Sequence, residues 1–369
     1  MPITVLADNT IAAAAQAVAE LLEGSSNPVM PVSAVEEAAL RRSLEDEPPQ
    51  PVPPGTALVM RTSGSTSGVG KSVLVSLNSL TASAHATHEA LGGPGRWACC
   101  LPTHHIAGFQ TIFRSLLSEN APLDAGKGSP EEIARIAAGI ADDRVYLSLV
   151  PTQLVRLLDS PHAAAARAFA TILLGGSAAS PEMVSRAREA GLNIVTTYGM
   201  TETCGGCVYN GLPIGDTSIS LGEGGRITIA GSVVATGYLG AAPFDGKCVT
   251  QDAGSWADGR LRIHGRLDGA ITTGGLTILP QVVEAELEKM GSGQCVVVGI
   301  PDAQWGEIVV AVTTNPLDDP RGRLRQRLEA GYTPRVFFTA AQLGLESLPY
   351  LASGKIDRRG VQRLVGKRL

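Results

Sequence analysis

The sequence predicts an α/β fold built on a parallel sheet, and two observations support this prediction. Short apolar segments of strand length alternate along the chain with segments of helical periodicity. Residues 171–202, TILLGGSAASPEMVSRAREAGLNIVTTYGMTE, contain a buried strand, a helix and a second strand in that order. Such a βαβ unit makes its two strands parallel, because the helix carries the chain back across the sheet.

Local start and stop signals justify the individual elements. In the βαβ unit, Ser180 followed by Pro181 is typical of a helix cap with proline in the first turn, and Gly191 ends the helix. An earlier helix is expected over residues 9–24, capped by Asn9 and stopped by Gly24. Strands are expected at ALVM, residues 57–60, and at residues 145–149, and the proline-rich residues 48–54 form a surface connector.

The composition excludes several classes of protein. A chain of 369 residues that is 44% hydrophobic buries a large core and favours two domains over one. It carries 30 Lys and Arg against 35 Asp and Glu, and no basic stretch is interleaved with aromatic residues, so we expect no nucleic-acid partner. Without a basic leader or an apolar run of membrane-spanning length, we expect a soluble cytoplasmic protein. A homodimer is left open.

The six cysteines do not suggest a disulfide framework in a chain of this length, which agrees with a reducing compartment. Cys204 and Cys207 have the spacing of redox and zinc sites. However, there is no second pair, and one pair cannot supply the four ligands of a structural zinc site. We therefore favour packing beside a functional loop for this pair, and burial at a strand end for Cys99 and Cys100.

The segment RTSGSTSGVGKSV, residues 61–73, ends like a Walker A loop but has the wrong spacing. Five residues separate Gly64 from Gly70, whereas the Walker pattern has four between its first glycine and the Gly-Lys pair. The backbone amides and hydroxyl groups of this segment still suit an anion, with Lys71 as a nearby charge. The segment therefore predicts a phosphate-binding loop without identifying the enzyme.

Two other loops follow predicted strands, namely GGSAAS at residues 175–180 and TYGMTE at residues 197–202. Ligands of open α/β sheets bind beyond the carboxyl ends of the strands. We therefore expect these two loops and the phosphate-binding loop to converge on one rim, where glycines allow the backbone to approach a nucleotide closely.

Seven motifs in order resemble the AMP-forming acyl-CoA ligases, the superfamily of luciferase and of peptide-synthetase adenylation domains. They are TSGSTSGVGKSV, LPTHHIAG, LLGGSAAS, TTYGMTET, TQDAG, GRLDGAITTGG and LPYLASGKIDR, and the resemblance covers roughly residues 57–360. It implies a large N-terminal domain, residues 1–266, of α/β layers with parallel sheets and a small β-subdomain, followed by a small mobile α+β domain, residues 267–369. It also implies ATP-dependent formation of an acyl-adenylate and transfer of the acyl group to coenzyme A.

The resemblance assigns residues to ATP and Mg²⁺ motif by motif. Glu202 would hold Mg²⁺, Thr201 would contact the α-phosphate, Asp252 the ribose hydroxyls, Arg266 ribose or phosphate, and Lys355 would bridge the acid and the α-phosphate. The remaining nucleotide-binding residues are Thr62, Ser63, Gly64, Ser65, Thr66 and Lys71 for the outer phosphates, Gly175, Gly176 and Ser177 for adenine and acyl group, and Tyr198, Gly199 and Met200 beside the base. A residue inserted near Ser67, and Gly70 in place of proline, depart from the family pattern. Two alternatives stay open: Asp252 as a turn residue and Glu202 as a helix-capping carboxylate.

The resemblance also assigns the second half-reaction. Asp268 matches the hinge between the domains, although Gly269 replaces the second aspartate of the usual pair. Gly274 and Gly275 would face coenzyme A, and Pro280 begins an amphipathic helix.

The loops around the acid are closest to those of the 2-succinylbenzoate:CoA ligases of menaquinone synthesis. Such a dianionic acid needs polar donors at the far end of its pocket, and the candidates are His105, Thr152, Gln153 and Thr203. His105 is also a candidate catalytic residue, and Ser177 would line the acyl group. His104 and His105 packed at a strand end remain an alternative. Two other functions also stay open: a ligase for another aryl or acyl acid, and a non-catalytic adenylate-binding relative with an altered phosphate loop.

Overall fold

The computed structural model describes residues 3–7, 10–24, 27–33, 37, 52–62, 71–141, 143–351 and 355–369. The chain divides into two compact units. Unit 1 comprises residues 1–220, 228–249 and 258–260, and unit 2 comprises residues 221–227, 250–257 and 261–369. Segments on both sides of residue 266 thus belong to unit 2, and the predicted hinge at this point stays a prediction.

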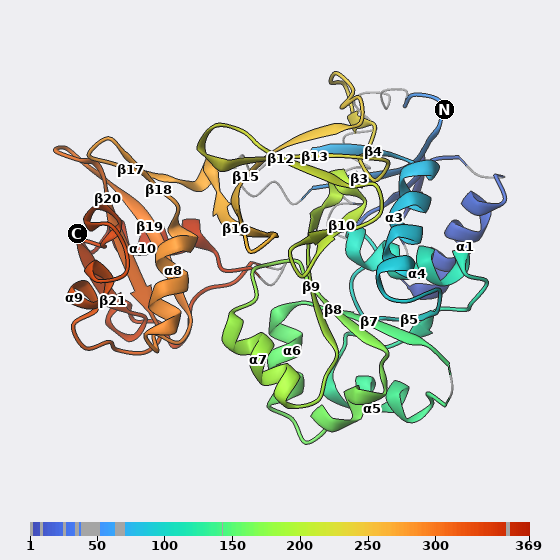
Figure 1. Ribbon diagram of the computed structural model, residues 1–369, viewed down its shortest axis with the longest axis horizontal. Coiled ribbons are helices and arrows are strands. Elements are labelled where there is room, and N and C mark those ends of the chain that lie inside the picture. Colours follow the sequence, from blue (N-terminus) through green and yellow to red (C-terminus); the bar gives the residue numbers. More distant parts are fainter. Residues whose placement is uncertain are drawn as a thin grey trace. The chain divides into compact units, whose positions relative to one another are not determined.

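A mostly parallel sheet of seven strands forms the centre of unit 1, which confirms the predicted α/β class (Figure 1). Neighbouring strands are parallel from β6 through β5, β7 and β8 to β9, and β10 and β11 extend the sheet in antiparallel hairpins. In sheet order the strands are β11 (Leu212–Pro213), β10 (Gly205–Tyr209), β9 (Ile194–Met200), β8 (Thr171–Leu174), β7 (Val145–Leu149), β5 (Arg96–Cys99) and β6 (Leu123–Asp124).

Helices cover both faces of this sheet, because successive strand residues point to opposite sides. Trp97, Tyr146 and Leu173 pack on one face, and Ala98, Leu147 and Ile172 pack on the other. The first face is covered by α1 (Ile11–Leu22), α3 (Leu77–Ala90) and α4 (Ile106–Leu117), and the second by α5 (Pro130–Ala138), α6 (Pro151–Leu158) and α7 (Pro181–Glu189) (Figure 1). The result is a three-layer α/β arrangement.

The predicted βαβ unit is β8, α7 and β9. Ser180 caps α7 by accepting a hydrogen bond from the Met183 N–H group, and Gly191 follows the helix with a left-handed φ of 82°. The second strand is longer than predicted: Tyr198, Gly199 and Met200 belong to β9, not to a loop. Helix α1 is also confirmed, but its side-chain cap is Thr10; the predicted cap Asn9 lies outside the described residues.

A second sheet of unit 1 carries the strand that leads into the predicted phosphate-binding loop. Its order is β1 (Thr4–Leu6), β2 (Val29–Pro31), β3 (Thr56–Arg61), β4 (Ser72–Ser76) and β14 (Gly237–Tyr238). Leu58, Met60 and Val73 pack into the same core as α1, α3 and α4. The loops after β8 and β9 share a sheet edge, whereas β3 belongs to a different sheet. Residues 63–70 lie outside the described residues, so the predicted convergence of the phosphate-binding loop on this rim stays a prediction.

A third sheet has the order β12 (Ser218–Leu221), β13 (Arg226–Ala230), β15 (Lys247–Ala257) and β16 (Arg260–Arg266). Asp252 lies within β15, so the alternative that it is a turn residue was wrong. The turn comes later, at Asp258 and Gly259, which have left-handed φ angles of 53° and 69°.

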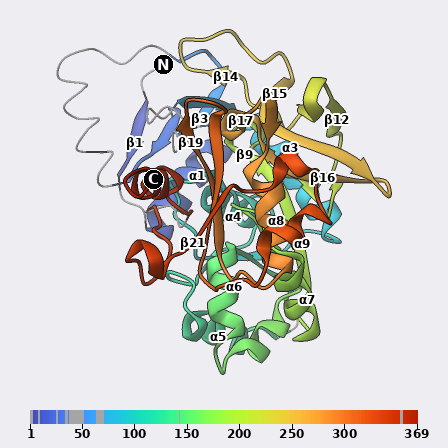
Figure 2. The same cartoon turned by 90° about the vertical axis from the view of Figure 1, so that its left-hand side faces the viewer.

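Unit 2 is built on a five-stranded sheet with helices on both faces (Figure 2). Its path is β18 (Leu276–Ile278), β17 (Ile271–Thr273), β20 (Gly306–Thr313) and β19 (Cys295–Asp302), with β21 (Val336–Thr339) beside β20. Alternate residues of β19 face α8 (Pro280–Lys289) and α9 (Pro320–Arg325) on one side and α10 (Arg358–Gly366) on the other. Helix α8 begins at Pro280, as predicted.

The remaining elements are short 3-10 helices. They are η1 (Ala163–Ala168), η2 (Thr201–Thr203), η3 (Glu223–Gly225), η4 (Leu267–Gly269), η5 (Ala330–Tyr332) and η6 (Ala341–Leu343). In the described ranges, no helix combines the length and apolar character that crossing a membrane requires.

Candidate active site

The base of the predicted phosphate-binding loop is closed by two hydrogen bonds. The Thr62 N–H group donates to the Lys71 carbonyl at 2.9 Å, and the Lys71 N–H group donates to Thr62 Oγ1 at 3.0 Å. Strands β3 and β4 pair in antiparallel register below this point. Four predicted phosphate ligands, Ser63, Gly64, Ser65 and Thr66, lie outside the described residues.

Lys71 and Glu202 are brought together by Tyr238, a residue that the sequence analysis did not single out. Nζ of Lys71 lies 4.5 Å from the centroid of the Tyr238 ring, and the Tyr238 hydroxyl donates a hydrogen bond of 2.7 Å to Oε1 of Glu202. Strand β14 positions Tyr238 opposite Val73 of β4, two residues after Lys71. The predicted phosphate-binding cation and the predicted Mg²⁺ ligand thus belong to one cluster.

The turn after β8 approaches the neighbouring strand closely. A Cβ atom on Gly175 would lie 2.4 Å from Oγ1 of Thr197, and Gly176 has a φ of 82°, so both positions favour glycine. Ser177 in this turn is exposed, and Tyr198 on the adjacent strand β9 is half-buried. Thr201 and Glu202 follow directly in η2, so they lie at the same edge of the sheet.

In unit 2, Arg266 connects two of the predicted site residues. Nε and Nη2 of Arg266 donate to the two carboxylate oxygens of Asp268 at 2.8 and 2.5 Å, and Nη1 lies 3.8 Å from Oδ1 of Asp252. Asp252 is only 9% exposed, whereas Arg266 is exposed. The predicted ribose ligand and the predicted hinge residue therefore share one guanidinium group.

Lys355 lies close enough to Arg266 and Asp252 to interact with both charges. The Leu351 N–H group donates to the Lys355 carbonyl at 2.8 Å, and Tyr350 pairs with Ile356 in an isolated bridge. Although part of Lys355 is exposed, loss of hydration around its ammonium group lowers the pKa below the ordinary lysine value. The charge of Arg266 lowers this pKa further, and Asp252 opposes the shift.

The predicted coenzyme A turn joins β17 and β18. Gly274 and Gly275 have φ angles of 56° and 83°, and a Cβ atom on Gly274 would lie 2.9 Å from the Trp305 ring. The Gly274 N–H group donates to the Trp305 carbonyl at 2.9 Å. The conformation of this turn therefore requires glycine at Gly274 for both space and backbone geometry.

The residues predicted to bind the acid differ in whether their polar groups are already hydrogen-bonded within the chain. Thr203 is completely buried and its hydroxyl group is hydrogen-bonded to Met200 and Gly205, which gives it a structural role. In Gln153, Oε1 accepts from the Val150 N–H group and Nε2 donates to the Lys127 carbonyl, both at 3.0 Å, so this amide caps α6. Thr152, beside it in the first turn of α6, is half-buried.

His104 and His105 precede α4, and their ring centroids are 4.4 Å apart. Both residues are half-buried. They therefore lie at a helix start, some residues beyond the end of β5. Their rings pack against each other without being enclosed in the core.

Arg114 is a buried cation that the sequence analysis missed. It lies on α4, is 3% exposed, and stacks on Trp97 with its Cζ atom 5.0 Å from the ring centroid. Among the described residues, its Nε has no hydrogen-bond partner and no carboxylate pairs with it. Burial lowers its pKa, because burial disfavours the charged form. Charged residues on the buried face of an apolar helix are the sequence signal that could have revealed it.

Arg114 adjoins the hairpin that follows Glu202. A Cβ atom on Gly205 would lie 3.8 Å from Nη2 of Arg114 and from Cγ of Gln110. Gln110, one turn earlier on α4, donates to the Cys204 carbonyl, but its Oε1 has no partner in the described part of the chain. This polar cluster therefore has unused hydrogen-bonding capacity inside the core of unit 1.

Cys204 and Cys207 pack in the interior of unit 1. Cys204 and Cys207 are both fully buried, and neither is in a disulfide. Burial raises the pKa of the Cys204 thiol and raises that of Cys207 to about 12, so both stay protonated at neutral pH. Cys99 and Cys100 are buried at the end of β5, as predicted.

The described residues contain no cluster of three or more His, Cys, Asp or Glu side chains suited to a metal ion. A site of the kind predicted at Glu202 does not need one, because Mg²⁺ is commonly held by one or two carboxylates together with substrate phosphates. The lone carboxylate, oriented by the Tyr238 hydroxyl, fits that arrangement.

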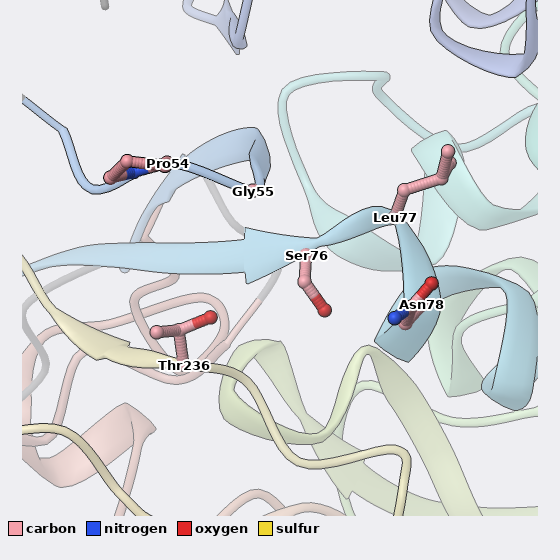
Figure 3. Close-up of a pocket in the computed structure, with 6 residues that line it drawn as sticks. All are labelled: Pro54, Gly55, Ser76, Leu77, Asn78 and Thr236. Atoms are coloured by element: carbon pink, nitrogen blue, oxygen red, sulfur yellow. The ribbon is translucent and has the colours of Figure 1, made fainter. Parts of the chain in front are cut away.

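Figure 3 shows a surface pocket of unit 1, about 280 Å³ in volume, at the start of α3. It is lined by Pro54, Gly55, Ser76, Leu77, Asn78 and Thr236. None of the predicted site residues lines it. Ser76 is engaged as the cap of α3, so the pocket is formed by a helix start and a connector.

The central sheet, its glycine turn, and the cluster of Lys71, Tyr238 and Glu202 define a nucleotide-binding α/β enzyme class. The profile of the family described as AMP-binding enzyme matches residues 4–235. The chain belongs to this family.

Known proteins agree with that assignment. A probable 2-succinylbenzoate–CoA ligase of Mycobacterium tuberculosis is 37% identical over 336 residues, covering 84% of this chain and 85% of the relative. Escherichia coli MenE, solved with an analogue of OSB-AMS, has a TM-score of 0.77 at 22% identity and covers 100% of this chain and 88% of its own. Bacillus subtilis MenE, solved with ATP and a magnesium ion, has a TM-score of 0.71 at 24% identity, with 96% and 83% covered.

Proposed function

We propose that this chain activates 2-succinylbenzoate with ATP and Mg²⁺ and transfers the acyl group to coenzyme A. The products are 2-succinylbenzoyl-CoA, AMP and pyrophosphate, an activity of menaquinone synthesis. The name of the Mycobacterium tuberculosis relative, which matches most of the chain, supports this substrate. The observation that carries the proposal is the buried guanidinium group of Arg114, which has no carboxylate partner among the described residues and whose Nε has no hydrogen-bond partner there.

A buried cation without a carboxylate partner is costly, since neither water nor an opposite charge stabilises it. A substrate anion would remove that cost. 2-Succinylbenzoate has two carboxylates: the succinyl group reacts with ATP, and the ring carboxylate is left for recognition. We propose that the ring carboxylate enters beside Gly205 and pairs with Arg114. The acid then has a charged partner in addition to the candidates His105, Thr152 and Ser177.

Unit 1 supplies the groups that hold ATP. Thr62 and Lys71, with the loop between them, bind the outer phosphates, and Thr201 contacts the α-phosphate. Gly175, Gly176, Tyr198, Gly199 and Met200 receive adenine. Glu202 binds Mg²⁺, which when bound neutralises phosphate charge as pyrophosphate departs. The Tyr238 hydroxyl supports this role by fixing one carboxylate oxygen of Glu202.

Unit 2 supplies the charges for the first half-reaction. Asp252 accepts hydrogen bonds from the ribose hydroxyls and Arg266 binds ribose or phosphate. The ammonium group of Lys355 bridges the acid and the α-phosphate. The succinyl carboxylate oxygen attacks the α-phosphorus, and the bond to pyrophosphate breaks. Lys355 neutralises the charge of the two anionic reactants as they meet.

In the second half-reaction the thiol of coenzyme A loses its proton and its sulfur attacks the acyl carbonyl carbon. The bond to AMP then breaks. Gly274 and Gly275 allow the pantetheine arm to approach, and Asp268 is the hinge about which residues 267–369 turn between the two steps. We place the reaction in the cytoplasm, where ATP and coenzyme A are available. A homodimer stays a prediction that light scattering can check.

The test is pyrophosphate release with a panel of acids, with and without coenzyme A. We expect 2-succinylbenzoate to be the preferred acid, ahead of 3-benzoylpropionate, which lacks the ring carboxylate, and of medium-chain fatty acids. Leaving Arg114 unpaired typically costs about 1–3 kcal/mol, so the analogue should lose roughly tenfold or more in kcat/KM.

The variant Arg114→Met tests the role of the Arg114 guanidinium group by itself. It should lower kcat/KM for 2-succinylbenzoate and leave that for 3-benzoylpropionate nearly unchanged, so that the preference collapses. Arg156→Met, at an exposed position of α6, is the control for the loss of one arginine charge. Equal use of all three acids by the unaltered enzyme would contradict the substrate. An unchanged preference in Arg114→Met would contradict the role of Arg114 alone.

A further inference from the structure

Unit 2 contains a partly buried ion pair that the proposed reaction does not use: the Glu284 side chain is buried and the Arg358 side chain is 37% exposed. Glu284, on α8, is 8% exposed, and its two carboxylate oxygens accept hydrogen bonds from Nη1 and Nη2 of Arg358 at 2.5 and 2.6 Å. Both partners also bind Val297 of β19: the Val297 N–H group donates to Glu284 at 2.7 Å, and Arg358 donates to the Val297 carbonyl at 3.0 Å. One strand residue therefore fixes both side chains.

Arg358 is the first residue of α10 and follows Lys355 by three positions. The chain between them is anchored on its other side as well. The Asp357 N–H group donates to the Pro349 carbonyl at 2.8 Å, and Asp357 caps α10 through the Gly360 N–H group. Lys355 is thus followed directly by a segment, residues 357–358, whose position is set by these contacts and by the ion pair of Arg358.

Glu284 connects this base to the other functional turn of unit 2. Helix α8 begins at Pro280, directly after β18, and β18 follows the Gly274 and Gly275 turn. Helices α8 and α10 pack on opposite faces of the sheet, so they do not share an apolar interface. The ion pair, passing beside Val297, is a direct polar link between them.

We propose that Glu284 and Arg358 are positioning residues that hold Lys355 in the geometry needed for adenylation. The inference rests on the proposed function, because it takes Lys355 as the residue that meets the acid and the α-phosphate. A bidentate pair fixes orientation as well as distance, which a lysine in place of arginine does not reproduce. Exposed ion pairs contribute little to stability and buried ones repay little more than their desolvation, so a role in geometry explains this partly buried pair better.

The experiment compares the two half-reactions in Arg358→Lys and Arg358→Gln. Adenylation is followed by pyrophosphate release, and transfer is followed by thioester formation from supplied 2-succinylbenzoyl-adenylate. Displacement of a reacting group by about 1 Å costs up to about a hundredfold in rate, so we expect adenylation by Arg358→Lys to fall roughly tenfold or more. Transfer should stay within about threefold of wild type, because Lys355 does not take part in it. The control is Arg327→Gln. Arg327 is the partly exposed ion-pair partner of Glu286, which lies on α8 like Glu284, and this variant should leave both rates near wild type.

Equal losses in both half-reactions of Arg358→Lys would show a merely structural role and overturn the inference, as would unchanged adenylation. If Arg358→Gln does not fold, Arg358→Lys decides, because it keeps a positive charge beside Glu284. Lys355→Ala separates this inference from the proposed function. If Lys355→Ala leaves adenylation intact, the proposed role of Lys355 fails. If Lys355→Ala abolishes adenylation and Arg358→Lys does not slow it, only the positioning role fails.

Discussion

Lys355 is the residue whose ionisation should set the alkaline limit of adenylation. Its ammonium group must be protonated to bridge two anions, and loss of hydration together with Arg266 lowers its pKa. A group with a lowered pKa loses its proton at a lower pH than an ordinary lysine. Adenylation should therefore decline as pH rises through that lowered value, while thioester formation from supplied adenylate should not. Stopped-time assays of both half-reactions across the alkaline range measure this difference.

Lys355→Ala is the reference for that experiment. It should abolish adenylation at every pH, so that no decline at alkaline pH is left to observe, and it should spare thioester formation. If the alkaline limb of the wild-type enzyme were the same for both half-reactions, the titrating group would not be Lys355. Equal loss of both half-reactions in Lys355→Ala would contradict the assignment of the lysine to the first step.

Single residues also show where sequence reasoning stops. Glu202, Asp252 and Lys355 could be assigned from motifs, because a motif fixes residue type and order. Arg114 could not, since its burial and its lack of a partner depend on how α4 packs against Trp97 and the β9–β10 hairpin. The same applies to Thr203 and Gln153, whose polar groups are used by neighbouring backbone atoms that no motif reveals.

At the scale of elements, the pairing of β14 with β4 makes a prediction about Mg²⁺. It places the Tyr238 hydroxyl on Glu202 and the Tyr238 ring beside Lys71. Tyr238→Phe keeps the ring and removes the hydroxyl group, so Glu202 loses its fixed orientation. We expect Tyr238→Phe to need more Mg²⁺ for half-maximal activity, by roughly two- to tenfold given a hydrogen bond of about 0.5–1.5 kcal/mol.

Two further variants are compared in the same Mg²⁺ titration: Glu202→Gln, with a larger expected effect, and Tyr209→Phe, as a control. Glu202→Gln should raise the Mg²⁺ requirement more than Tyr238→Phe does, with the thermal unfolding midpoint little changed. Tyr209→Phe removes a buried hydroxyl bonded to Thr87, away from Glu202, and should leave the Mg²⁺ requirement unchanged. Identical Mg²⁺ titrations for all three variants and the wild type would remove Glu202 from the metal site.

Elements with strong local signals could be predicted from the sequence, and elements defined by pairing could not. Helix α7 carries its own cap, proline and glycine stop, and β7 is a short, mostly apolar segment interrupted only by Ser148, so both were predicted correctly. The segment around Asp252 contains turn-forming residues, yet it is part of the long strand β15, because pairing within its sheet overrides local preference. Tyr198 to Met200 became strand for the same reason, through pairing with β10.

At the scale of the whole molecule, the chain has two compact units, and the proposed reaction needs groups from both. Composition predicted two domains, but not that residues 221–227 and 250–257 would group with the C-terminal part. Such grouping depends on contacts between segments far apart in the sequence, which no local pattern records. The predicted hinge at Asp268 can be tested by comparing how substitutions at Asp268 change the rates of adenylation and of thioester formation.

Asp268→Pro is that test. Proline fixes φ near −65° and removes an N–H donor, so it restricts the backbone rotation that a hinge requires. If residues 267–369 must turn between the two steps, Asp268→Pro should slow thioester formation more than adenylation, by about tenfold or more, because only the second step needs the rotated state. Rapid-quench measurement of each half-reaction with 2-succinylbenzoate gives the ratio.

Asp268→Asn separates rotation from charge. The Asp268 carboxylate accepts hydrogen bonds from Nε and Nη2 of Arg266, which also lies near Asp252. Proline at position 268 therefore removes this ion pair as well as restricting the backbone. Asparagine breaks most of that ion pair but leaves the backbone free to rotate. A hinge predicts that Asp268→Asn transfers the acyl group much faster than Asp268→Pro. If the two variants were equally slow, the ion pair with Arg266 would explain the defect; if Asp268→Pro transferred at the wild-type rate, Asp268 would not be the hinge.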